Sequence, residues 1–257
     1  MATIETAHAN DWPDLHSLLD EYFTHYDGYI FRGQADAQWS VDSTLTRALA
    51  RLGTPSERVE EKVAGHLQRF KEQVRGRSRI DLQSSSDDTM WSLGQHYGLY
   101  TPLLDWSRSP YVALYFSLLG SSASGTRALY ALVEADVSDI SVAFSKSDEV
   151  QIVKPLSHEN VRIVSQGGLF LKLPVGESLV GLVEKTPECG WVTLYKITYP
   201  DSIKNDALAA LNNMNINHAS LFPDLVGSSQ HANFLLEIDP HLERGREEGF
   251  QRGRTEA

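Results

Sequence analysis

Apolar positions recur at helical spacing in three parts of the chain. Between residues 59 and 74 they step by four, four, three and four, which predicts an amphipathic helix. Residues 12–22 show similar spacing, with a proline near the first turn, and predict another amphipathic helix. Residues 112–119 are apolar on nearly every side, so we expect a buried helix with Ser109 as its N-cap and Pro110 as its first residue.

Shorter apolar runs predict strands. Residues 29–31 form one such run, and its end presents Arg32. Residues 128–133 have the length and content of a buried strand, and residues 149–153 and 191–199 mostly alternate between polar and apolar positions. With further helices expected around residues 90–93 and 203–214, the pattern indicates the α+β class.

The composition is that of a folded protein outside the membrane. Of the 257 residues, 41% are hydrophobic, yet no stretch approaches the roughly 18 apolar residues that a membrane helix needs. The N-terminus lacks the basic start and apolar run of a signal peptide, so we expect a cytoplasmic protein. A single cysteine excludes an internal disulfide, and the scattered histidines predict no metal site.

A net charge of −11 disfavours long-range attraction to nucleic acid. Basic residues do gather locally between positions 69 and 79. Their ordinary interpretation is the solvated face of a helix, and the alternative is a surface for nucleic acid or a partner protein. The basic side chains of this segment are Arg69, Lys71, Arg75, Arg77 and Arg79.

Residues 94–119 hold the densest concentration of side chains capable of chemistry. Gly94, Gly98 and Pro102 predict a turn-rich loop over residues 94–106, which the buried helix then follows. Such a loop either presents a binding site or fills the edge of the core with its aromatic side chains. The candidate binding residues of the loop are Gln95, His96, Tyr97, Tyr100, Thr101, Asp105 and Trp106.

Three separated motifs resemble the FRG-domain family of bacteria and phages. They are Phe31-Arg32-Gly33, the 94–119 segment with its Leu-Leu-Asp-Trp and Ala-Leu-Tyr-Phe sequences, and the Leu-Phe-Pro-Asp-Leu sequence of residues 221–225. A similar Gln-x-Gly-x-Phe sequence occupies residues 166–170. We therefore expect an FRG-like domain over residues 1–240 and a charged, fraying tail over residues 241–257.

The resemblance also implies a fold and an activity. The family looks distantly similar to ADP-ribosyltransferases, so we expect one α+β domain with a split antiparallel or mixed sheet and helices around it. The implied activity is transfer of ADP-ribose from NAD to an unknown protein or nucleic-acid acceptor. The implied setting is that of a defence or toxin-like effector, with an antitoxin as a further expected partner.

Several residues receive roles from this resemblance. Arg32 would hold a phosphate or ribose of NAD, and Gly33 would let the ligand approach the backbone. His96 and Tyr97 would face the nicotinamide, although a lone histidine in a loop is more often bonded to its surroundings. Additional residues expected to contact NAD are Gln95, Thr101, Tyr111, Tyr115 and Gln166, and the tyrosines could equally belong to the core.

The transfer reaction needs a carboxylate that stabilises positive charge on the ribose. We expect Asp224 in this role in preference to Glu237, although both could be ordinary surface or helix-end carboxylates. Asp105 lies in apolar company and must be paired, so we expect it to orient Arg32, with Trp106 beside it.

Two positions depart from the family pattern. Pro102 stands where family members usually carry an arginine, and Val226 stands where an acidic residue is common. The loss of one positive group leaves an alternative function open: a module that binds a nucleotide, a nucleic acid or a partner without catalysis.

Overall fold

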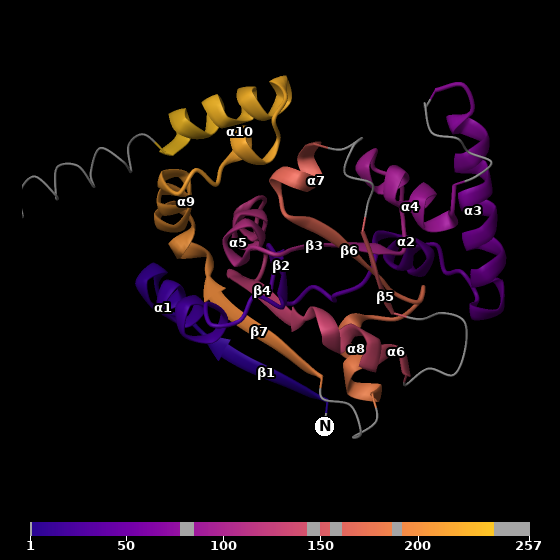
Figure 1. Ribbon diagram of the computed structural model, residues 1–257, viewed down its shortest axis with the longest axis horizontal. Coiled ribbons are helices and arrows are strands. Elements are labelled where there is room, and N and C mark those ends of the chain that lie inside the picture. The colour runs from indigo at the N-terminus through magenta and orange to yellow at the C-terminus, as the bar shows by residue number, and fades with distance from the viewer. Residues whose placement is uncertain (1, 78–84, 143–149, 155–160, 187–191, 239–257) are drawn as a thin grey trace, which may run out of the picture.

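A seven-stranded sheet forms the centre of the molecule (Figure 1). The computed structural model describes residues 2–77, 85–142, 150–154, 161–186 and 192–238. The strand order is β1-β7-β4-β2-β3-β6-β5. The strands are β1 (Thr3–His8), β2 (Tyr29–Gln34), β3 (Leu103–Ser107), β4 (Thr126–Val133), β5 (Gln151–Val153), β6 (Gly168–Lys172) and β7 (Thr193–Pro200).

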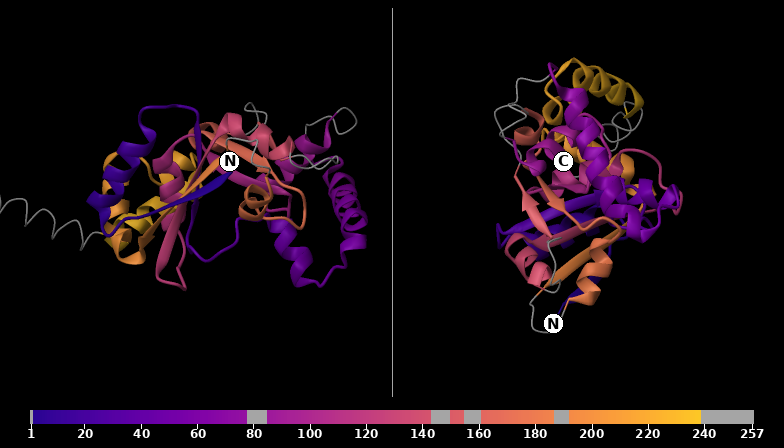
Figure 2. Two further views of the ribbon diagram at one scale, coloured as in Figure 1. Left: turned by 90° about the horizontal axis from the view of Figure 1, so that it is seen from below. Right: turned by 90° about the vertical axis from the view of Figure 1, so that its right-hand side faces the viewer.

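Helices surround this sheet at its ends and on its faces (Figure 1 and Figure 2). They are α1 (Trp12–Phe23), α2 (Thr44–Arg51), α3 (Val59–Val74), α4 (Asp87–His96), α5 (Pro110–Leu118), α6 (Val137–Val142), α7 (Val161–Ser165), α8 (Leu179–Lys185), α9 (Lys204–Asn213) and α10 (His218–Leu221). A further helix covers residues 225–238. Every helix in the described part of the chain is too short or too polar to cross a bilayer.

The sheet contains both parallel and antiparallel strand pairs, and its pairing is narrowest between β2 and β3. Neighbouring strands are antiparallel except β1 and β7, which run parallel. Between β2 and β3 a single residue pair is in register, Phe31 with Ser107, so the strands diverge beyond it. The predicted α+β fold with a mixed sheet and surrounding helices is confirmed. The strands form one seven-stranded sheet, and its narrowest junction lies beside Arg32.

Alternation along β2 divides the core between the two faces of the sheet. Phe31 packs in an apolar cluster with α5, α1 and α9, whereas Ile30 packs in a cluster with α6 and α8 on the opposite face. Because Phe31 pairs with Ser107, the alternate residues Leu103 and Asp105 of β3 lie on the α5 face. A third cluster, formed with α2, α3 and α4, includes Leu103 and therefore covers the α5 face of β3 and β6.

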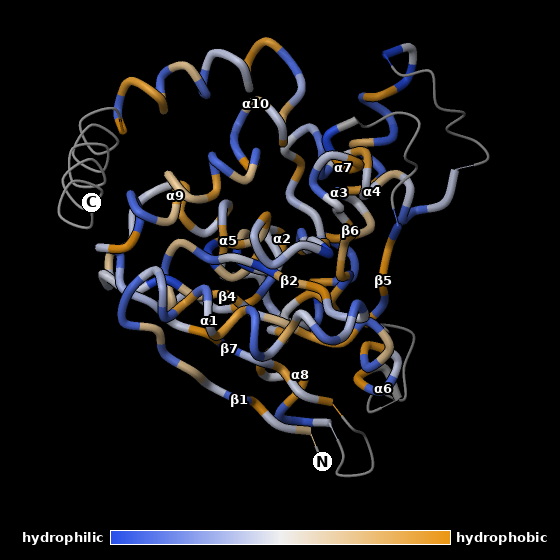
Figure 3. The backbone as a smooth tube through the Cα atoms, turned by 60° about the vertical axis from the view of Figure 1, so that its left-hand side comes forward, coloured by the Kyte–Doolittle hydropathy of each residue, from blue (hydrophilic) through white to orange (hydrophobic). Residues whose placement is uncertain are grey.

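Serine side chains cap the starts of two helices. Ser109 accepts from the Val112 N–H, with Pro110 as the first residue of α5, as predicted. The Ser43 side chain, which was not predicted as a cap, accepts from the Thr46 N–H at the start of α2. The α5 helix is buried almost throughout, as expected. Figure 3 shows β5 as a mostly hydrophobic segment, whereas hydrophobic and hydrophilic stretches alternate along the helix of residues 225–238.

The prediction of one loop over residues 94–106 is wrong. Gly94 lies inside α4. A Cβ there would meet the Leu99 side chain at 2.5 Å, so the glycine lets Leu99 pack closely against the helix. Gly98, with φ of 83°, follows the end of α4. Residues 103–107 then enter the sheet as β3. Strand β1 was not predicted, since it is a half-exposed edge strand with weak alternation. The predicted tail of residues 241–257 lies outside the described residues.

Candidate functional site

A cavity of about 130 Å³ lies over β3 and β6. Segments far apart in the sequence form it: the end of α4, the middle of β3, the turn from α7 into β6, and the residue after α10. Figure 1 shows α7 between α5 and α4 above these two strands. The lining residues are Gln95, His96, Asp105, Trp106, Arg162, Ile163, Gln166, Gly168, Leu169, Phe170 and Phe222.

Asp105 supplies a carboxylate to this cavity. Gln95 Nε2 donates to Asp105 Oδ2 at 2.9 Å, and Gln95 Oε1 accepts from the buried Thr101 hydroxyl. These bonds connect the last turn of α4 to β3 and orient the carboxylate. Oδ1 of Asp105 has no hydrogen-bond donor among the described residues, so one oxygen remains for a ligand.

His96 lines the cavity as a neutral base. Burial, and then the positive charge of Arg162, lower the pKa of the His96 imidazole. Its ring is half-buried and makes an edge contact with Tyr97, whose ring centroid is 4.7 Å away. A neutral imidazole at pH 7 can accept a proton from a reacting group.

Gln166 also lines the cavity, and its side chain has a structural bond as well. Its Nε2 donates to the Leu221 carbonyl at 3.1 Å, while its own carbonyl accepts from the Ser107 hydroxyl at 2.7 Å. Gln166 thereby connects the α7–β6 turn to α10 and to β3. Both interpretations of this residue, as a turn former and as part of the site, agree with its position.

Arg32 and Gly33 do not line the cavity. Arg32 alternates with Phe31 and shares the opposite sheet face with Ile30. Its Nη1 donates to the Asp105 carbonyl oxygen at 2.8 Å across the narrow β2–β3 junction. The Asp105 carboxylate accepts from Gln95 instead, so the expected ion pair between this carboxylate and Arg32 is not found among the described residues. Burial lowers the pKa of Arg32, and the negative charge of Asp105 partly opposes this shift. The Arg32 Nε is buried and has no hydrogen-bond partner among the described residues.

The space beside Gly33 is filled by α5. A Cβ on Gly33 would lie 2.0 Å from the Ala113 carbonyl oxygen and 2.8 Å from the Ser117 nitrogen. The expectation that a ligand approaches this backbone is therefore corrected: helix α5 makes the close approach. The glycine of the Phe-Arg-Gly motif is explained by helix-on-sheet packing.

Asp224 lies outside the cavity and caps a helix. Its carboxylate accepts from Arg162 through Nη2 and, at 3.1 Å, through Nε, and from the Gly227 N–H at 2.8 Å. The Gly227 N–H and then Arg162 hold the pKa of Asp224 below its usual value. Glu237 is exposed on the helix of residues 225–238 and also lies outside the cavity. Neither of the two carboxylates expected to stabilise the ribose lines the cavity.

The remaining residues predicted to contact NAD do not line the cavity. Thr101 is buried, and Tyr97 is 74% exposed. Tyr111 lies near His16, with ring centroids 5.9 Å apart. Tyr115 is buried and hydrogen-bonds His218 Nδ1.

The residues at the two departures from the family pattern also lie outside the cavity. Pro102 is buried immediately before β3, and Val226 is exposed near the start of the helix of residues 225–238. Neither residue appears among those that line the cavity.

Arg162 was not predicted, although it lines the cavity. The guanidinium carbon lies 5.3 Å from the Phe222 ring centroid, and the His218 ring stacks on Phe222 at 5.4 Å. Tyr115 of the buried helix α5 holds His218 by the hydrogen bond already described. The available signal was the spacing of Arg162 and Gln166, because residues four apart on a helix share one side.

The His218 contact makes fold stability depend on pH. Burial, and then the charge of His231, lower the pKa of His218. A histidine whose folded-state pKa is lowered stabilises the fold above its unfolded pKa of about 6.5, and this contribution is lost as pH falls through the folded pKa. We expect the decrease in free energy of unfolding between pH 7.5 and 5.5 to be smaller in His218→Asn, which keeps an acceptor for Tyr115 but cannot titrate. Urea unfolding at both pH values measures this.

The exposed His25, in the turn after α1, provides the control for this measurement. His25→Asn should retain the wild-type pH dependence. Equal dependence in His218→Asn and wild type would contradict the role given to His218.

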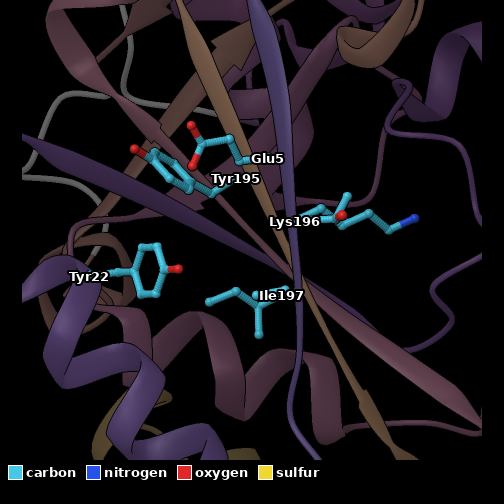
Figure 4. Close-up of a pocket in the computed structure, with 7 residues that line it drawn as sticks. Glu5, Tyr22, Tyr195, Lys196 and Ile197 are labelled. Atoms are coloured by element: carbon cyan, nitrogen blue, oxygen red, sulfur yellow. The ribbon is translucent and has the colours of Figure 1, made fainter.

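A second hollow of about 20 Å³ lies between α1 and the β1–β7 pair (Figure 4). Glu5, Tyr22 and Tyr195 are among its lining residues. It has room for about one water molecule and is too small for a nucleotide. Among the described residues, no group of three His, Cys, Asp or Glu side chains is arranged to hold a metal ion.

The basic 69–79 segment has the features of a solvated helix surface. Lys71 pairs with Asp87 at 2.6 Å, and Arg69, Arg75 and Arg77 are exposed. Arg79 lies outside the described residues. Helix α3 also carries acidic side chains, including those of Glu60, Glu61 and Glu72, so its surface has mixed charge.

Comparison with known proteins finds a family match in the N-terminal half of the chain. Residues 27–125 match the family model of the FRG domain. The match spans β2, α4, β3 and α5, and therefore includes the Asp105 wall of the cavity. No curated protein and no solved structure matched the chain. Over residues 27–125, the chain is therefore similar to the FRG domain.

Proposed function

We propose that the protein binds NAD in the cavity over β3 and β6 and transfers its ADP-ribose group to a macromolecular acceptor. The observation that carries this proposal is the oriented Asp105 carboxylate, with one oxygen unbonded, in a cavity lined by Phe170 and Phe222. Aromatic side chains suit the nicotinamide ring, and the carboxylate suits its positive charge and that of the reacting ribose. An ADP-ribosyltransferase-like fold is part of the same proposal.

The proposed reaction breaks the bond between nicotinamide and ribose. The electron pair leaves with nicotinamide, and positive charge develops on the ribose, where Asp105 stabilises it. A nucleophile of the acceptor then bonds to the ribose carbon and gives up a proton. His96 accepts this proton, because its lowered pKa keeps the imidazole neutral at pH 7.

The size of the cavity limits which part of NAD it encloses. Cavities for whole small-molecule ligands typically measure about 300–1,000 Å³, whereas this one measures about 130 Å³. The nicotinamide end therefore occupies the cavity, and the adenosine part lies across the neighbouring surface. The family resemblance adds that the activity serves in bacterial or phage defence, with an antitoxin as a regulatory partner.

The test is incubation of the full chain with NAD labelled on nicotinamide or on adenine. We expect free labelled nicotinamide, and adenine label on an acceptor from a bacterial lysate, with the added ADP-ribose mass located by mass spectrometry. Binding of NAD without nicotinamide release would instead favour a nucleotide-binding module. The ion pair between Arg162 and Asp224 supports this alternative, because it engages a carboxylate that was expected to be catalytic. If the chain does not bind NAD, both the transferase proposal and the nucleotide-binding alternative are wrong.

A further inference from the structure

Arg162 is the one arginine or lysine among the described residues that line the cavity. It extends from α7, whereas Asp105 comes from β3, so the positive and negative groups enter from different walls. Arg162 lies close enough to His96 for its charge to lower the pKa of that imidazole. The cavity thus presents opposite charges to a single ligand.

Asp224 fixes one edge of the Arg162 guanidinium. Its Oδ2 accepts from Nε and Nη2, which occupies that edge of the planar group. Nη1 has no hydrogen-bond partner in the described parts of the chain. A guanidinium held in this way offers its other edge as a pair of donors, a geometry that matches two oxygens of a phosphate.

Aromatic rings fix the plane of the same guanidinium. Arg162 lies over Phe222, which stacks on His218 with an angle of 24° between the rings. His218 is bonded to Tyr115 of the buried helix α5. Through these three residues the arginine is supported by the core of the domain, so little side-chain freedom is lost when it binds a ligand.

The charge of Asp224 does not cancel that of Arg162 for a ligand. The Asp224 carboxylate also accepts from the Gly227 N–H, at the start of the helix of residues 225–238. The backbone N–H groups and dipole of that helix offset part of its negative charge. The field toward the cavity therefore retains a positive component from the guanidinium.

We infer that Arg162 binds a phosphate group of the ligand, and that Asp224 is the positioning residue that aims the guanidinium. This assignment rests on the proposed nucleotide function and specifies which side chain recognises the anionic part. It also gives Asp224 a role in place of charge stabilisation on the ribose.

The experiment compares nicotinamide mononucleotide with nicotinamide riboside, which lacks the phosphate. Calorimetry on the full chain should show that the wild type prefers the phosphate-bearing ligand by roughly 10- to 100-fold. Arg162→Gln should remove this preference, because neither ligand then meets a guanidinium. Asp224→Asn should reduce the preference in part, and Arg162→Lys should retain some of it because the charge remains.

Arg51→Gln, which alters an exposed arginine at the end of α2, is the matched control and should keep the full preference. The inference is overturned if the wild type shows no phosphate preference, if Arg162→Gln retains it, or if that variant loses affinity for both ligands equally. Nicotinamide release from NAD without a phosphate preference defeats only this assignment. An Arg162-dependent preference without nicotinamide release defeats only the transferase proposal.

Discussion

Asp105→Asn is expected to lower the rate of nicotinamide release from NAD by roughly 100- to 1,000-fold, the usual effect of losing one electrostatic stabiliser of a transition state. The asparagine oxygen can still accept from Gln95, so the contact between α4 and β3 survives. The substitution removes the negative charge that would face the ribose while positive charge develops on the ribose. The reduction should therefore appear in kcat, with little change in KM. Steady-state kinetics with nicotinamide-labelled NAD measures both.

Asp27→Asn is the control for this experiment. Asp27 is exposed in the turn before β2, so the same chemical change there should leave the rate unchanged. Thermal unfolding of both variants verifies that they fold. If folded Asp105→Asn releases nicotinamide at the wild-type rate, Asp105 does not stabilise the reacting ribose.

Gly33→Ala is expected to lower the free energy of unfolding by about 3 kcal/mol, at the upper end of the cost of overpacking a core. The added Cβ would meet the backbone of α5, with 2.0 Å to the Ala113 carbonyl oxygen. Backbone atoms of a buried helix cannot rotate away as a flexible side chain can. To relieve the clash, α5 would have to move from β2 and disturb the core between them. Urea unfolding followed by circular dichroism gives the change.

Gly65→Ala should have the opposite effect on the stability of the fold. Gly65 lies in the middle of α3, and its Cβ would have the flexible end of Arg69 as nearest neighbour, at 3.4 Å. Helix propensity should make this variant more stable by about 0.5–1 kcal/mol. A Gly33→Ala protein with wild-type stability that fails to bind NAD would restore the interpretation of Gly33 as a ligand contact.

Local signals were enough to predict most of the elements. The helical spacing of residues 59–74 and the capping residue Ser109 act within a few residues, so they can be predicted without the fold. Strand β1 was missed because it depends on pairing with β7, which is nearly two hundred residues away. Gly94 was read as a helix breaker, yet it lies within α4 and lets Leu99 pack closely against the helix.

The sequence motifs included several residues that line the cavity, but they did not predict how these residues are arranged in space. Gln95, His96 and Gln166 were predicted as ligand contacts and do line the cavity. Arg32 was placed with them, although the alternation along β2 puts it on the other sheet face from Phe31. The faces of β2 and β3 can be related only through their register, which is set by the pairing of Phe31 with Ser107.

By itself the sequence determined the α+β class, the buried helix α5, and the similarity of residues 27–125 to the FRG domain, because these depend on periodicity, capping and contiguous motifs. Only the tertiary structure decided which carboxylate enters the cavity, and which arginine accompanies it. Asp105 and Arg162 line the same cavity because β3 pairs with β6, and α7 leads directly into β6. Contacts of such sequence separation depend on strand register and helix packing, which no local pattern encodes.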